Sequence, residues 1–326
     1  MTDLRTKLYQ MFILGLSGDN YNSVLKQGLG GIIFFTDDIY SEKQFKNLIS
    51  SIKSAAKIPP FLSIDQEGGR VERTENIHEG KKYLSAKFAC EKGEDFLTAQ
   101  TQDIAKELKS YGINLNFAPC IDVNTNPDNP IIGERSFSSD ADKVIECEKI
   151  VSDIYKKNGI IPCVKHFPGH GDADKDSHLT LPFIDLSLKE MEKVHIKPFK
   201  YAIKNGVPMV MAAHLYCSCF ENTPIPTSLS KNALEYLRNN LGFEGVVISD
   251  DMVMKGVSAF GKIQACLMGI NAGINLFIYR NSDDETINMI ESIYDIAKND
   301  KSLIEKIEYS YEKITDLKKE YIFDNI

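Results

Sequence analysis

IIPCVKHF, residues 160–167, is a short run of apolar and β-branched residues that contains Lys165 and His166 near its end. A run of this length is typical of a strand buried on both faces of a parallel sheet. Ionisable residues at the carboxyl end of such a strand are placed where α/β enzymes carry out their chemistry. This segment therefore indicates an α/β fold with a polar site at the strand end.

Seven more runs of this kind occur along the chain. They cover residues 11–16, 30–35, 59–65, 113–119, 207–215, 245–251 and 273–279. Amphipathic segments with helical periodicity lie between the runs, over residues 42–56, 95–111, 141–158, 187–205 and 230–240. Three of these segments begin at serines that suit an N-cap: Ser41, Ser187 and Ser230. Eight strands alternating with helices predict an α/β fold of the (β/α)8 TIM-type barrel class.

Polar residues at strand ends favour a closed barrel over an open, doubly wound sheet. They follow at least five of the expected strands: Asp65, Asn116, Lys165 with His166, His214, and Asp250 with Asp251. In a barrel the carboxyl ends of all strands meet on one face, so residues far apart in the sequence can line one pocket. Charged residues also occur simply where a strand becomes a loop, but this does not account for a cluster as dense as KHFPGHGDADKDSH, residues 165–178.

The chain of 326 residues is long enough for two average domains or for one barrel. No linker rich in Gly, Pro or Ser interrupts the pattern, and residues 283–319 have the amphipathic character of closing helices. We therefore expect a single barrel domain over residues 1–326.

The net charge, the apolar runs and the cysteine content limit the binding partners and the cellular compartment that we expect. The net charge of −8 works against binding to nucleic acid. No apolar run reaches the length of about 18 residues that a transmembrane helix needs, and the N-terminus lacks a signal-peptide pattern. Seven scattered cysteines without a CxxC spacing indicate reduced thiols rather than a disulfide framework. We expect a cytoplasmic monomer that acts on a small molecule, with neither nucleic acid nor a membrane as partner.

The cluster at residues 165–178 raises the question of a metal. Three of its histidines are candidate zinc ligands: His166, His170 and His178. A proline and a glycine between the first two prevent them from sharing a helix face. Three aspartates have the spacing that opens an EF-hand calcium loop: Asp172, Asp174 and Asp176. The glycine and the glutamate that such a loop needs further on are absent, so we expect no metal and no cofactor.

Three carboxylates and one histidine are candidates for catalysis or binding. A histidine with a carboxylate two residues away, as in Asp176 and His178, can act as a general acid and base. An isolated Asp-x-His is usually structural, but the glycines and polar residues around this one favour the catalytic interpretation. Asp250 fits a nucleophile, a metal ligand or a helix cap. Asp65, with arginines close behind it in the sequence, suits recognition of sugar hydroxyls.

Four segments, in this order and spacing, resemble glycoside hydrolase family 3. They are IDQEGGRVER (64–73), NFAPCIDVNTNPDNPIIGERSF (116–137), KHFPGHGDADKDSH (165–178) and VVISDDM (246–252). The resemblance extends over nearly the whole chain, and the histidine of the DSH segment is typical of the single-domain β-N-acetylglucosaminidases of the NagZ type. It implies a retaining exo-β-N-acetylglucosaminidase that acts on a small saccharide or muropeptide derived from peptidoglycan.

The resemblance also implies roles for individual residues. Asp250 matches the nucleophile that forms a covalent glycosyl-enzyme, and His178 matches the general acid/base, with Asp176 as its partner. Five residues match those that hold the hydroxyls of the N-acetylglucosamine ring: Asp65, Arg73, Arg135, Lys165 and His166. No direct role follows for Asp251.

Three other functions remain open on the same residues. Most retaining glycosidases use two carboxylates, so a histidine acid is unusual. Because a histidine does not repel an anion, phosphate could replace water as the acceptor, and the enzyme would then be a phosphorylase. A metal-dependent barrel hydrolase and a non-catalytic sugar-binding protein are further alternatives. The presence of a nucleophile, an acid and an orienting carboxylate disfavours the binding protein.

Overall fold

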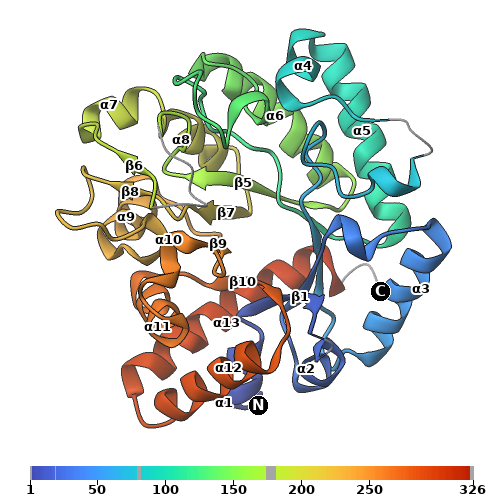
Figure 1. The fold of residues 1–326 in the computed structure, drawn as a ribbon, viewed down its shortest axis with the longest axis vertical. Helices are drawn as coiled ribbons and strands as arrows, with labels where there is room; N and C mark the ends of the chain where they lie inside the picture. Colours follow the sequence, from blue (N-terminus) through green and yellow to red (C-terminus); the bar gives the residue numbers. More distant parts are fainter. Residues whose placement is uncertain (1, 19, 79–81, 174–180, 324–326) are drawn as a thin grey trace.

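The computed structural model describes residues 2–18, 20–78, 82–173 and 181–323. Eight parallel strands close into a barrel with helices around it (Figure 1). The strands are β1 (Phe12–Ser17), β2 (Gly31–Phe34), β3 (Phe61–Ile64), β4 (Leu115–Asn116), β5 (Ile161–Phe167), β7 (Met209–Ala212), β9 (Val246–Asp251) and β10 (Leu276–Asn281). Neighbours in the barrel follow the order of the chain, and β1 closes against β10. The predicted (β/α)8 barrel is confirmed.

Burial explains why these runs become strands. Every residue of β2, β3, β5 and β7 is buried, because one face packs inside the barrel and the other packs against the helices. A strand with two buried faces needs apolar residues at successive positions rather than at alternate ones. All eight observed strands lie within or overlap the runs expected from the sequence.

The helices form the outer layer of the barrel (Figure 1). They are α1 (Leu4–Tyr9), α2 (Tyr21–Gln27), α3 (Glu42–Ala55), α4 (Ala86–Glu91), α5 (Glu94–Tyr111), α6 (Ala141–Lys157), α7 (Leu188–Lys193), α8 (Lys197–Lys204), α9 (Lys231–Glu235), α10 (Lys255–Ser258), α11 (Lys262–Ala272), α12 (Asp284–Ala297) and α13 (Lys301–Tyr321). Four short 3-10 helices and one π-helical turn add η1 (Thr36–Asp38), η2 (Glu75–Ile77), η3 (Gly133–Arg135), η4 (Thr227–Leu229) and η5 (Tyr236–Asn240).

The predicted N-caps are confirmed. The hydroxyls of Ser41, Ser187 and Ser230 each accept the backbone N–H three residues further on, at the start of α3, α7 and α9. The single helix expected over residues 187–205 is wrong, because the chain forms two helices there. The second, α8, has Pro198 in its first turn, where a residue without an N–H costs no intrahelical hydrogen bond.

A second, two-stranded sheet of β6 (Phe183–Ile184) and β8 (Tyr216–Cys217) lies outside the barrel. Its strands are too short to give a pattern in the sequence. Among the helices formed by the described residues, none combines the length and the apolar character needed to cross a lipid bilayer.

Candidate active site

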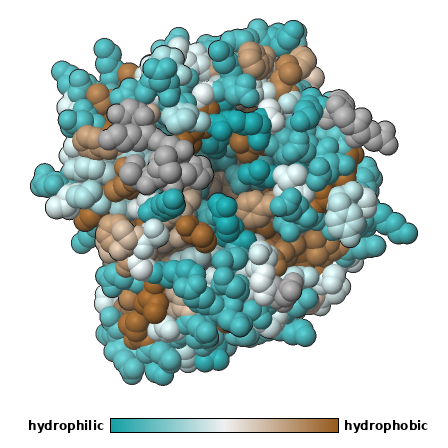
Figure 2. Space-filling view, viewed as in Figure 1, coloured by the Kyte–Doolittle hydropathy of each residue, from teal (hydrophilic) through white to brown (hydrophobic). Residues whose placement is uncertain are grey.

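A hollow of about 200 Å³ lies at the carboxyl ends of the barrel strands. Hydrophilic side chains gather around it in the middle of the face shown in Figure 2. Its lining includes six of the eight residues singled out in the sequence: Asp65, Arg73, Arg135, Lys165, His166 and Asp250. The other two, Asp176 and His178, lie outside the described residues. Asn116 does not line the hollow, because its amide is hydrogen-bonded to the backbone of Gln66, at 2.9 Å in both directions.

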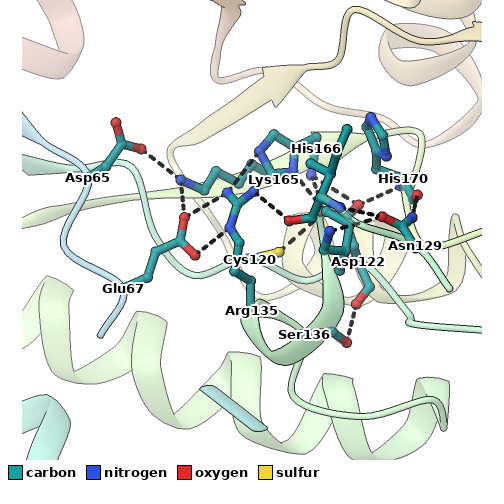
Figure 3. Close-up of polar contacts among 12 residues, drawn as sticks. Asp65, Glu67, Cys120, Asp122, Asn129, Arg135, Ser136, Lys165, His166 and His170 are labelled. Carbon is teal, nitrogen blue, oxygen red and sulfur yellow. Dashed lines mark hydrogen bonds and ion pairs between the residues drawn. The ribbon is translucent and has the colours of Figure 1, made fainter. Parts of the chain in front are cut away.

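One wall of the hollow is a buried network of four charges (Figure 3). The Lys165 ammonium lies 2.7 Å from Asp65 Oδ1 and 2.6 Å from Glu67 Oε1. Arg135, on η3, makes a two-pronged contact with Glu67, at 2.9 Å through Nε and 2.8 Å through Nη2. Burial would raise the pKa of Glu67, but Arg135 and Lys165 outweigh it and hold that pKa well below its usual range. Glu67 is therefore ionised at neutral pH, and its charge raises the pKa values of Lys165 and Arg135.

A second network fixes His166 (Figure 3). Its Nδ1 lies 2.7 Å from Asp122 Oδ2, and its Nε2 lies 3.3 Å from Arg135 Nη2. Because a guanidinium can only donate, Nε2 accepts from Arg135 while Nδ1 donates to Asp122, and the two contacts fix the orientation of the ring. Asp122 also accepts the backbone N–H of His170 at 2.6 Å, and these contacts outweigh its burial and keep its pKa low.

The second network also contains a potential metal-ligating group. Cys120, Asp122 and His166 offer ligand atoms within 4.8 Å of one another. Burial raises the pKa of the Cys120 thiol, whose sulfur lies 3.3 Å from Asp122 Oδ2 as a donor. The three groups therefore satisfy one another by hydrogen bonds, and a cation would have to displace two protons from them. Of the zinc and calcium ligands considered in the sequence, His178, Asp174 and Asp176 lie outside the described residues.

Asp250 is the next-to-last residue of β9 and is partly exposed in the hollow. Its Oδ1 accepts the backbone N–H of Asp251 at 2.7 Å. Burial works to raise the pKa of Asp250, but His166, His214, this N–H and Lys165 outweigh it and lower the pKa below its ordinary value. The carboxylate is therefore ionised at neutral pH and open to a ligand, as a nucleophile requires.

Asp251 points into a different set of contacts. Its Oδ1 accepts the backbone N–H groups of Val253 and Arg280, and its Oδ2 forms a short ion pair with Arg280 Nε. Behind it, His214 Nε2 donates to the Asp251 carbonyl at 3.1 Å while Nδ1 is 2.7 Å from the Ser228 hydroxyl. Burial lowers the pKa of His214, and hydrogen bonds at both ring nitrogens fix the ring beside Asp250.

Two arginines line the mouth of the hollow. Arg73 and Arg280 both lie over the ring of Phe35, with guanidinium carbons 5.8 and 5.9 Å from the ring centroid. Arg280 keeps 54% of its side chain exposed. Its contact with Asp251 uses Nε, so the terminal nitrogens have no partner within the described parts of the chain. The deeper cations Lys165 and Arg135 are neutralised by carboxylates. The Nε of Arg73 is buried and has no hydrogen-bond partner among the described residues, whereas Arg280 is half exposed.

Sequence reasoning missed several residues of the site. Glu67, Asp122, His214 and Arg280 line or support the hollow, yet the sequence predicts no role for them, and His170, which also lines it, is considered only as a zinc ligand. His214 had been noted only as a polar strand end. Glu67 lies two residues after Asp65, and Asp122 lies six residues after the end of β4. This nearness to a strand end was the only indication of a role that the sequence offered for either residue. Burial lowers the pKa of His170 to about 4, so this ring is uncharged at neutral pH.

Comparisons with known proteins agree with this geometry. The chain matches the family described as "Glycosyl hydrolase family 3 N terminal domain" over residues 3–317. The β-hexosaminidase of Histophilus somni (strain 2336) is 32% identical over 286 residues, which cover 85% of this chain and 80% of that protein. β-Hexosaminidase A of Pseudoalteromonas piscicida is 33% identical over 275 residues, which cover 78% of this chain but 46% of that protein.

A solved structure gives the same result. A glycoside hydrolase family 3 β-N-acetylglucosaminidase from Paenibacillus sp. str. FPU-7 superposes with a TM-score of 0.92 at 31% identity. The match covers 99% of this chain and 64% of that chain, so this chain spans only part of two of these three relatives. On the family match and these identities, the chain belongs to glycosyl hydrolase family 3.

Proposed function

We propose that this chain is a retaining exo-β-N-acetylglucosaminidase that releases terminal N-acetylglucosamine from peptidoglycan-derived fragments. In this mechanism Asp250 attacks the anomeric carbon to form a covalent glycosyl-enzyme, and His178, paired with Asp176, is the acid and base. The observation that carries the proposal is the ionised carboxylate of Asp250, which lines the hollow together with His166, His214 and Lys165.

The enzyme class has independent support. The family match and the relatives named β-hexosaminidase or β-N-acetylglucosaminidase support a glycoside hydrolase of the β-N-acetylhexosaminidase kind.

The size of the hollow supports removal of one sugar at a time. Its volume of about 200 Å³ is below the roughly 300–1,000 Å³ typical of pockets for drug-sized ligands. One sugar ring fits such a space, whereas an internal stretch of a polysaccharide needs an open cleft. Asp65, Lys165 and Arg135 provide fixed charged donors and acceptors for the ring hydroxyls.

The mouth of the hollow supports an acidic aglycone. Peptidoglycan fragments carry carboxylates on the muramic acid ether and on the peptide, next to the bond that would be cleaved. The half-exposed guanidinium group of Arg280 can bind such a carboxylate in two-pronged fashion through its terminal nitrogens.

The nucleophile is tested by trapping. A fluorinated N-acetylglucosaminide should accumulate as a covalent adduct, and peptide mass spectrometry should place the label on Asp250, with the adjacent Asp251 as an internal control. Asp250→Ala should abolish turnover while the circular dichroism spectrum is unchanged. Near-normal turnover by this variant would refute the assignment.

The acid is tested by leaving groups. His178→Ala should slow alkyl glycosides far more than activated aryl glycosides, because good leaving groups need little protonation. Equal losses on both would argue against an acid role. Product analysis on a β-linked N-acetylglucosaminyl anhydromuropeptide, beside β-glucoside and β-xyloside analogues, fixes the sugar. Adding phosphate and looking for a sugar 1-phosphate separates hydrolysis from phosphorolysis.

A further inference from the structure

Two cysteines far apart in the sequence meet between two helices of the outer layer. Cys90 lies near the end of α4 and Cys147 in the middle of α6. Their sulfur atoms are 2.8 Å apart, and both residues are buried. Two non-bonded sulfur atoms at ordinary contact lie farther apart than this. The fold therefore holds two thiols about 0.8 Å beyond the length of a disulfide bond.

One of the two thiols can be reached from solvent. Cys90 lines a surface pocket of about 520 Å³, and Lys87 and Lys143 line the same pocket. Cys147 lies behind Cys90 and does not line it. Lys87 forms an ion pair with Glu91 at 3.9 Å, and Lys143 forms one with Glu146 at 2.9 Å. The positive charge beside Cys90 is therefore partly compensated by these glutamates.

The different access of the two thiols to the surface pocket sets an order of events. Burial raises the pKa of Cys147, and its hydrogen bond with Cys90 raises that pKa further. A thiol of this kind is a poor initial nucleophile but can attack a neighbour that is already activated. Cys90 is accordingly the thiol that meets an external reagent first.

We propose that Cys90 and Cys147 form a reversible thiol–disulfide pair that is oxidised by a low-molecular-weight disulfide. The Cys90 thiolate attacks one sulfur of the reagent and releases the other half as a thiolate. Cys147 then loses its proton and attacks Cys90 Sγ, which releases the second half. Two protein thiols become one disulfide, and one reagent disulfide becomes two thiols.

The disulfide would constrain helices that pack beside the active site, and it would not involve the catalytic residues themselves. Neither cysteine lines the sugar-sized hollow. Helix α4 packs against η3, which carries Arg135, and Ser85 at its start fits against Gly69, where a Cβ would lie 2.6 Å from the serine Cβ. Joining α4 to α6 would close a loop of 57 residues and restrict the unfolded chain.

The experiment uses the full chain in glutathione buffers of increasing oxidised fraction. Samples are quenched with acid, unfolded and alkylated, and the number of alkylated thiols is then measured by mass spectrometry. In the oxidised buffer the wild type should show two fewer alkylated thiols than its seven, and digestion should yield a peptide pair joining Cys90 to Cys147. The melting temperature should rise by about 5 °C and return on reduction.

Single variants separate this pair from general thiol oxidation. Cys147→Ser should accumulate Cys90 as a mixed disulfide with glutathione, whereas Cys90→Ser should leave Cys147 alkylatable. Cys219→Ser, which removes a half-exposed thiol elsewhere, should form the bridge as the wild type does. The proposal is overturned if Cys90 and Cys147 stay alkylatable in the oxidised buffer, or if the linked peptides join other cysteines.

Discussion

Glu67 supplies a negative charge to two buried cations, Lys165 and Arg135. Its side chain is 3% exposed and accepts hydrogen bonds from both Lys165 and Arg135. Those two cations in turn contact Asp65 and His166, which line the hollow. Glu67 does not line the hollow itself, so it acts by fixing the positions of groups that do. The site therefore depends on a residue behind its surface.

Replacing Glu67 by glutamine tests this dependence. The amide cannot neutralise Lys165 and Arg135, and breaking a buried ion pair costs about 3–5 kcal/mol in the free energy of unfolding. We also expect kcat/KM to fall about tenfold or more, because both cations shift. Urea unfolding and steady-state kinetics measure the two effects. Glu134→Gln is the matched control, since Glu134 makes no ion pair within the described chain; equal effects from both variants would contradict the role.

The same carboxylate predicts a loss of stability in acid. The pKa of Glu67 is lowered in the folded protein from its ordinary value of 4.5. The unfolded chain therefore takes up a proton first as the pH falls, so the stability that Glu67 contributes is complete above about pH 5 and declines below it. Urea unfolding at pH 7, 5, 4 and 3 should show a steeper decline for the wild type than for Glu67→Gln. Parallel curves would rule out this source.

The limits of sequence reasoning at this scale are visible in three carboxylates. Asp65 and Asp250 were found because each directly ends an apolar run. Asp122 was not, because strand β4 is only two residues long and the chain continues beyond it before the aspartate. Its contacts with His166 and His170 depend on the packing of two neighbouring loops, which no local pattern records. The roles of Asp176 and His178 stay predictions.

Among the elements, α13 has an unusual place at the base of the barrel. Its residue Lys318 is fully buried and donates to Gln10 Oε1 at 2.9 Å and to the Gly30 carbonyl at 2.8 Å. The ammonium lies 4.8 Å above the ring of Phe61, and no carboxylate pairs with it within the residues described. Burial lowers the pKa of Lys318 to about 7. The amphipathic pattern predicted this helix but gave no sign that a lysine would face the core.

This lysine predicts that the protein gains stability with rising pH. Between about pH 7 and pH 10 the unfolded chain holds a proton on Lys318 that the folded chain has released, so raising the pH removes a penalty on folding. Lys318→Met should lack this gain. The free energy of unfolding is measured at pH 7 and 9.5, with the exposed Lys319→Met as control. A wild-type gain no larger than that of Lys318→Met would refute the prediction.

For the whole molecule, closure of the barrel is what creates the site. Residues from position 33 to position 280 line one hollow only because β1 and β10, near the two ends of the chain, pair with each other. The number and order of strands follow from counting apolar runs, since each run must bury two faces. The register of each pair does not follow, because it depends on which backbone atoms can approach across the seam.

Gly15 shows what the seam requires. In β1 a Cβ at this position would lie 1.9 Å from the carbonyl oxygen of Arg280 on β10. Any side chain there pushes the two strands apart where the barrel closes, directly beneath the arginine at the mouth of the hollow. In the sequence Gly15 is indistinguishable from a small residue that merely tolerates a strand.

Gly15→Ala should therefore weaken closure and site together. Overpacking of this kind costs about 1–3 kcal/mol in the free energy of unfolding. Because the shifted segment carries Arg280, kcat/KM for an acidic aglycone should fall more than kcat/KM for a neutral one. Gly256→Ala is the comparison, since a Cβ there would meet its nearest atom at 3.2 Å. A Gly15→Ala protein that unfolds at the wild-type urea concentration would show that the seam tolerates separation, and the site would then owe its geometry to its own ion pairs rather than to barrel closure.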